Sequence, residues 1–244
     1  MDITEYHTYW LDRRSEQKFI PGLFKKLNEY TQEFIQKTND IPFDYQERAL
    51  VGHLAQAACR CGCFTIQDYD VSHGKLSRRG KKTHYRPDLW LSAPVPGKDR
   101  QTCVFEVKGN WIPLDKDSEK LRELLKTRLN EAYHQLSEHM EPEAKYSCAL
   151  VALRVSCARR KWKTFVGDSQ SYINKIRELK KRMEEVLETG WDDAVNANFW
   201  SYIFLRYRTA KRLCEKEAGQ LSPPTLGVIW VGFLRRTPLK SEKG

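Results

Sequence analysis

TCVFEVKGNW, residues 102–111, is a run of strand-forming residues interrupted by a glutamate and a lysine. Residues two apart on a strand point to the same face, so Glu106 and Lys108 share one face while Val107 points to the other. Charges inside an otherwise apolar strand are costly to bury and need a compensating role. The stretch predicts a core strand that carries a chemical site.

The segments on either side of this strand predict a mixed sheet. Phe64–Val71 and Pro87–Ser92 have strand composition and are separated by polar connections, which indicates a three-strand meander with residues 102–111. Helical spacing from Ser118 to His139 follows, and then the nearly continuous apolar run Tyr146–Val155. Such a run is typical of a central strand covered on both faces, and we expect an α/β fold.

Helical segments surround this centre. Residues 16–38 have helical apolar spacing, and Asp44 is a candidate cap for a helix over Tyr45–Ala58. Near the end of the chain we expect two helices and a strand: Asp168–Leu187, Asp192–Glu217 and Thr225–Leu234. The expected organisation is an N-terminal helical extension (1–43) and one domain (44–244), with a core at about 46–155 and C-terminal helices plus a strand (156–244).

The charge of the chain favours nucleic acid as a partner. The 244 residues include 42 Lys and Arg against 32 Asp and Glu, a formal net charge of +10, which attracts polyanions. A merely soluble basic surface and an anionic membrane surface are the alternatives. Two clusters are candidates for phosphate contact. They are Lys75, Arg78, Arg79, Lys81, Lys82 and Arg86 before the strand at Pro87, and Arg159, Arg160 and Lys161 beside Trp162.

The sequence predicts an intracellular protein with free cysteines. No segment has the roughly 20 apolar residues of a membrane span, and the N-terminus lacks the order of a signal peptide. We therefore expect a cytoplasmic protein whose seven cysteines are free thiols. Cys59, Cys61 and Cys63 form a CRCGC cluster with no compact partner set, so thiols at a turn are favoured over a metal site. The histidines form no zinc pattern and are assigned to packing or the surface.

Asp88 suggests a chemical role for the Glu106–Lys108 pair. If the strands at Pro87 and Thr102 pair, Asp88 comes next to Glu106. Mg²⁺ or Mn²⁺ is usually held by carboxylates with room for water and phosphate oxygens. We expect Asp88 and Glu106 to hold such a cation, and Lys108 to orient the attacking water or stabilise charge on a phosphate.

These residues resemble the signature of the PD-(D/E)XK nuclease superfamily, which has the restriction-endonuclease-like fold. Pro87-Asp88 matches its first half and Glu106-Val107-Lys108 its second, within an α-β-β-β-α-β order. The resemblance implies that Glu47, on the first core helix, is a further catalytic residue and metal ligand. It also suggests Gln135 on the second core helix, although His139 stands where exonuclease-like members carry a tyrosine.

Other interpretations compete with these assignments. A Glu-x-Lys triplet is frequent on amphipathic strands as a solvated charge pair. Glu47 also suits the first turn of a helix because of the helix dipole, and Gln135 suits a solvated helix edge.

The main hypothesis is a Mg²⁺- or Mn²⁺-dependent nuclease acting on DNA in preference to RNA. An inactive nucleic-acid-binding or scaffolding module and an RNA-directed nuclease are the alternatives. Endonuclease or exonuclease action, an oligomer or partner subunit, and roles such as phage defence stay open.

Overall fold

A seven-stranded mixed sheet forms the centre of the molecule, and its strand order is β1-β6-β7-β5-β4-β3-β2. The computed structural model describes residues 4–10, 19–68, 86–95, 98–138, 144–158, 161, 168–191, 195–216 and 225–237. The strands are β1 (Thr4–Trp10), β2 (Phe64–Gln67), β3 (Leu89–Val95), β4 (Lys98–Pro113), β5 (Tyr146–Ser156), β6 (Phe199–Leu205) and β7 (Thr225–Arg236). The helices are α1 (Phe19–Thr38), α2 (Glu47–Arg60), α3 (Ser118–Glu138), α5 (Ser169–Glu188) and α6 (Tyr207–Lys216), with a 3-10 turn η1 (Pro42–Asp44).

The predicted meander and central strand are confirmed. β2, β3 and β4 pair antiparallel in sequence order, and β4 pairs parallel with β5 through the crossover helix α3. β5 lies fourth of the seven strands, and every one of its residues is buried. The chain is therefore an α/β protein with a mixed sheet flanked by helices.

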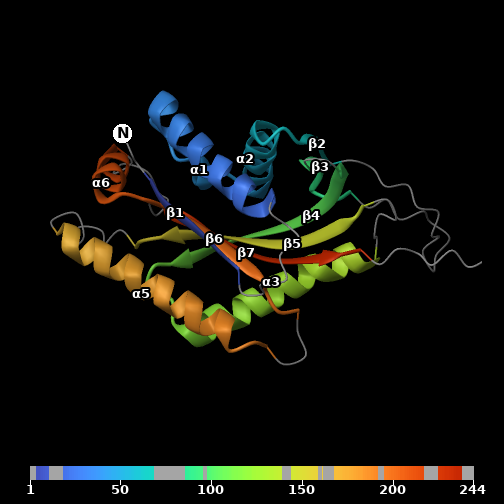
Figure 1. Ribbon diagram of the computed structural model, residues 1–244. Helices are drawn as coiled ribbons and strands as arrows, with labels where there is room; N and C mark the ends of the chain where they lie inside the picture. The colour runs from blue at the N-terminus through green and yellow to red at the C-terminus, as the bar shows by residue number, and fades with distance from the viewer. Residues whose placement is uncertain are drawn as a thin grey trace, which may run out of the picture.

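Helices cover both faces of the sheet, as Figure 1 shows, with α1 and α2 on one face and α3 and α5 on the other. On the first face, the ring of Phe24 in α1 packs against Phe199 and Trp230. On the second face, Tyr133 of α3 packs edge-on against Phe233 of β7. These contacts identify which strand side chains belong to which face of the core. None of the helices in the described ranges is long and apolar enough to cross a membrane.

The predicted helix over Asp192–Glu217 is wrong. Phe199–Leu205 is instead strand β6, all of whose residues are buried, and only Tyr207–Lys216 is helical. The segment FWSYIFL is rich in aromatic and β-branched residues, which favour strands. Burial on both faces removes the alternation that would have distinguished it from a buried helix.

The predicted N-terminal helical extension (1–43) also contains a strand that was not expected. Thr4–Trp10 forms β1, which pairs antiparallel with β6 along its whole length and extends the sheet at one edge. α1 follows the expectation and ends at Thr38. The predicted cap of α2 differs as well: Gln46 takes the N-cap position without a side-chain hydrogen bond, because Asp44 belongs to η1.

Two glycines of β7 leave space for aromatic side chains of the neighbouring strand β6. Gly227 and Gly232 are the register partners of Phe204 and Phe199, and a Cβ at Gly232 would collide with the fully buried ring of Phe199. Overpacking a core in this way costs about 1–3 kcal/mol. Gly232→Ala is therefore expected to lower the free energy of unfolding by that amount, measured by urea denaturation.

The matched control for that substitution is Gly22→Ala in α1. A Cβ at Gly22 meets no atom within 4 Å, and alanine is the better helix former by about 0.5–1 kcal/mol. Gly22→Ala should leave the urea midpoint unchanged or raise it. An unchanged midpoint for Gly232→Ala would show that β6 does not pack on β7 as described.

Candidate active site at the β4 overhang

β4 extends beyond the end of its neighbour β3. The pairing of the two strands ends at Leu89 opposite Phe105, whereas β4 stays paired with β5 on its other side up to Pro113. We call residues 106–113 the β4 overhang. Backbone N–H groups of alternate strand residues point to the same side, so those of Val107 and Gly109 face the side that β3 leaves open. Unpaired strand amides of this kind need acceptors.

Asp88 supplies the first acceptor. It directly precedes β3, and its Oδ2 accepts a hydrogen bond of 2.7 Å from the N–H of Val107. This contact brings the carboxylate next to Glu106, which the predicted pairing of the two strands requires. Asp88 is partly buried, and Pro87 before it is fully covered.

Glu106 and Lys108 lie on the face covered by α3. Glu106 is the register partner of Ala149, and Ala149 is the register partner of Phe233, which contacts α3. Lys108 Nζ lies 2.8 Å from Glu106 Oε1, and the two side chains are 19% and 5% exposed. The low exposure argues against a solvated surface pair, the principal alternative for a Glu-x-Lys triplet.

Glu47 reaches the overhang from the other face of the sheet. It is the first residue of α2, and its Oε2 accepts a hydrogen bond from the N–H of Gly109. Two acids from different parts of the chain thus bind backbone amides two residues apart on one strand, next to the Glu106–Lys108 pair. Glu47 does not join Asp88 and Glu106 in a single tight cluster, but its charge still acts on Asp88.

The electrostatic environment makes Asp88 unusual among the acids that the structure describes. Burial raises the pKa of its carboxyl to about 7, and repulsion from Glu106 contributes in the same direction. The Val107 amide and the Lys108 ammonium oppose this rise, and Glu47 adds a smaller increase. Partly buried carboxylates that repel each other favour a bound cation, which would stabilise their ionised forms.

The donor set matches one type of metal site. Across the described ranges no group of three or more His, Cys, Asp and Glu side chains is placed to hold a metal ion. Mg²⁺ does not require such a cage, because it commonly binds one or two carboxylates while waters and substrate phosphates complete its shell. Asp88 and Glu106 fit that type of site, with hard oxygen donors beside each other.

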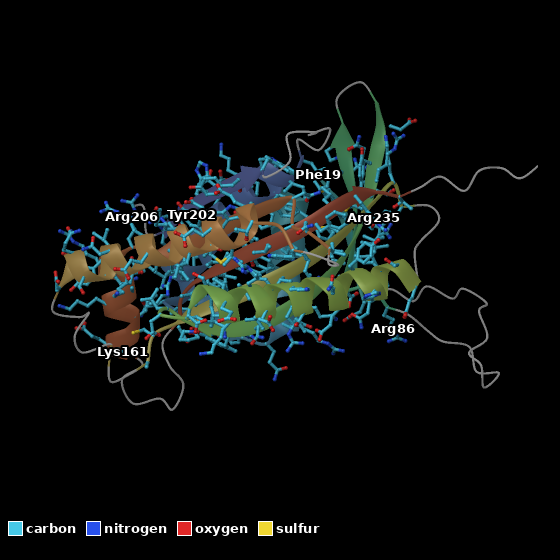
Figure 2. All side chains as sticks on the ribbon, turned by 90° about the horizontal axis from the view of Figure 1, so that it is seen from below. Phe19, Arg86, Lys161, Tyr202, Arg206 and Arg235 are labelled. Carbon is cyan, nitrogen blue, oxygen red and sulfur yellow. The ribbon has the colours of Figure 1, made fainter. Side chains whose placement is uncertain are left out.

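The other predicted site residues lie at different places around the molecule. Gln135 is exposed on α3, and within the described ranges no hydrogen bond joins it to Asp88 or Glu106. Arg86 is exposed two residues before Asp88, whereas Lys161 pairs with Asp115, two residues beyond the end of the overhang, and lies far from Arg86 (Figure 2). The remaining residues of both basic clusters lie outside the described residues: Lys75, Arg78, Arg79, Lys81, Lys82, Arg159 and Arg160.

Histidine and cysteine behave as expected where the structure describes them. His53 is buried among the rings of Tyr30, Phe34 and Phe43, and burial lowers its pKa to about 4. In the CRCGC cluster Cys59 is exposed and Cys63 is buried, and burial raises the pKa of Cys63 to about 11. A raised pKa lowers the share of thiolate, so the Cys63 thiol is a weak nucleophile in this environment.

Arg154 lies beside the overhang and is not among the predicted site residues. Arg154 of β5 is only 8% exposed, donates a 2.7 Å hydrogen bond from Nη1 to the carbonyl of Tyr45, and stacks on Trp111. Its bond to Tyr45 fixes the chain just before Glu47. The signal for it is present in the sequence, because Arg154 is the one charge inside the apolar run of residues 146–155.

Gly109 allows Glu47 to approach the strand. A Cβ at this position would lie 3.1 Å from Glu47 Oε2 and 3.6 Å from Arg154 Nη2, so Gly109→Ala should push the carboxylate off the amide. The expected loss of unfolding free energy is about 1 kcal/mol, the contribution of such a hydrogen bond. A urea-denaturation cycle checks this: in a Glu47→Ala background the same change should cost much less. Additive costs would show that Glu47 does not occupy this position.

Comparisons with protein-family models, with curated proteins and with solved structures return no match for this chain. The proposed function therefore rests on the geometry of the β4 overhang.

Proposed function

We propose that this chain is a metal-dependent nuclease with a restriction-endonuclease-like core, and that it acts on DNA. The observation that carries the proposal is the placement of Asp88 beside the buried Glu106–Lys108 pair at the β4 overhang. The element order α2-β2-β3-β4-α3-β5 supports it, because this α-β-β-β-α-β order is the one expected for such a core. The net charge of +10 suits a polyanionic substrate.

In the proposed site, Asp88 and Glu106 hold Mg²⁺ or Mn²⁺, and Glu47 supports them from α2. When bound, such a cation lowers the pKa of a coordinated water and neutralises charge on the phosphate. Lys108 has three N–H donors, and its bond to Glu106 uses one of them. Its remaining donors serve the attacking water and the phosphate oxygens, so it orients the nucleophile and stabilises developing negative charge.

Purified protein tests the proposal directly. Supercoiled plasmid, linear duplex, single-stranded DNA and RNA of the same sequence are incubated with Mg²⁺, with Mn²⁺ and with EDTA. We expect DNA to be cut in the presence of metal and to stay intact in EDTA. Cutting of RNA alone would change the proposed substrate, and no cutting of any polymer would reject the nuclease.

The binding-module alternative has a different signature in the same preparation. It predicts DNA binding that needs no metal and is unaffected by Glu106→Ala. That binding would be lost when Arg78, Arg79, Lys81 and Lys82 are neutralised.

A further inference from the structure

Trp111 presents an aromatic ring at the β4 overhang. It is one of the few large apolar side chains in the described ranges with substantial exposure, at 38%. Its register partner on β5 is Arg154, whose guanidinium carbon lies 4.5 Å from the centroid of the indole ring. The backbone N–H of Trp111 donates to Asn110 Oδ1 at 2.8 Å. The ring therefore has a cation on one face and a fixed backbone, while part of its surface is open to a ligand.

Arg154 holds this ring in place and is itself held firmly. It is only 8% exposed, and its Nη1 donates a hydrogen bond to the Tyr45 carbonyl. Its Nε is buried, and no hydrogen-bond acceptor for it lies among the protein atoms described. Burial lowers the pKa of Arg154 and the nearby Glu47 charge raises it. An arginine that is largely buried and anchored through Nη1 has little freedom to move, so it is a rigid support for the indole ring.

Trp111 continues the row of groups that line the overhang. The N–H of Val107 binds Asp88 and the N–H of Gly109 binds Glu47. By strand alternation the Trp111 side chain leaves β4 on the face of Glu47, opposite to Glu106 and Lys108. Strand residues two apart are separated by about 7 Å. Trp111 is four residues from Val107, about 13 Å along the strand, so a nucleic-acid strand that has one phosphate at the acids and passes over the open edge of β4 can bring a base one or two nucleotides away to the indole ring.

We propose that Trp111, backed by Arg154, stacks on an unpaired base one or two nucleotides from the phosphate that is cut, so that the substrate is single-stranded DNA or a frayed or flipped nucleotide. This inference rests on the proposed nuclease function. Within a duplex both faces of a base are covered by its neighbours, whereas an unpaired base offers a face to an aromatic side chain. Stacking of this kind tolerates any sequence, because every base has a π face.

The test measures binding without catalysis. Short single-stranded DNA carrying 2-aminopurine, and the corresponding duplex, are titrated with full-length protein in EDTA, and both affinity and quenching of the 2-aminopurine emission are recorded. Trp111→Ala should weaken single-strand binding about tenfold and abolish the quenching, whereas Trp111→Phe should retain most of both. Duplex affinity should be the same for all three proteins.

Phe64→Ala is the matched control, because Phe64 is 67% exposed on β2 and has Arg100 stacked 4.4 Å from its ring centroid. It should bind single strands like the parent protein. The proposal is overturned if the parent does not bind single strands, if Trp111→Ala binds them as tightly as the parent, or if Phe64→Ala loses as much affinity. Failure of the nuclease function is seen separately, as metal-containing reactions without cleavage while the quenching persists.

Discussion

Lys108→Ala is expected to reduce metal-dependent DNA cleavage about a thousandfold, measured as the initial rate of plasmid nicking at saturating Mg²⁺. Removing one preorganised group that stabilises transition-state charge typically costs about 10²–10³ in rate. Lys108 also keeps Glu106 in position through their 2.8 Å ion pair, so both effects act in the same direction. Glu106→Gln and Asp88→Asn should lose at least as much activity, because each removes a proposed ligand.

Lys180→Ala is the matched control for Lys108→Ala. Lys180 is also ion-paired, with Glu5, and its side chain is 15% exposed against 19% for Lys108. It lies on α5 and should keep the parent rate. Since removing one partner of a buried pair can destabilise a fold, rates are compared below the melting temperature of every variant. A Lys108→Ala protein that is folded and cuts at the parent rate would reject the proposed mechanism.

Asp88→Asn should make the protein more stable at alkaline pH. The pKa of Asp88 is about 7 in the folded protein, against an ordinary value of 3.8. A raised pKa means that the protonated form favours folding, so this contribution is complete below pH 4 and is lost as the pH rises through 7. A shift of this size corresponds to about 4 kcal/mol, which solvent screening of the partly exposed group reduces to about 3 kcal/mol. Urea denaturation at pH 8.5 should show this gain, and the gain should shrink steadily toward pH 4.

Mg²⁺ connects that stability effect to the proposed site. A cation held by Asp88 favours the ionised carboxylate, so Mg²⁺ at pH 8.5 should stabilise the parent protein and leave Asp88→Asn unchanged. Asp115→Asn serves as the control, because the hydrogen bond from Lys161 lowers the pKa of Asp115. That variant should gain no stability at pH 8.5. Equal stability of Asp88→Asn and the parent at every pH would show that Asp88 is not in the described environment.

The sheet was predictable where local pattern and tertiary environment agree. The apolar run ending at Val155 predicts a strand covered on both faces, and β5 is such a strand. The same rule fails for Phe199–Leu205, because a short, fully buried segment has no polar face to reveal its period. β1 was missed because it is a short edge strand, and its pairing with β6 depends on a segment about 190 residues away in the chain.

The placement of the candidate site residues could be predicted from the two-residue period of a strand and from strand pairing. Alternation places Glu106 and Lys108 on one face, and strand pairing places Asp88 beside them. The role of the overhang was not predictable, because it depends on β3 ending opposite Phe105 while β4 continues to Pro113. That tertiary detail leaves amides for Asp88 and Glu47 to bind, and it gives Arg154 and Trp111 a place beside the acids.

The most direct test of the central claim is the anomalous scattering of Mn²⁺ in crystals of the protein. The account predicts a peak within ligand distance of both the Asp88 and Glu106 carboxylates, which disappears in Asp88→Asn crystals. A protein that cuts DNA while Mn²⁺ binds at a position remote from the β4 overhang would contradict the account.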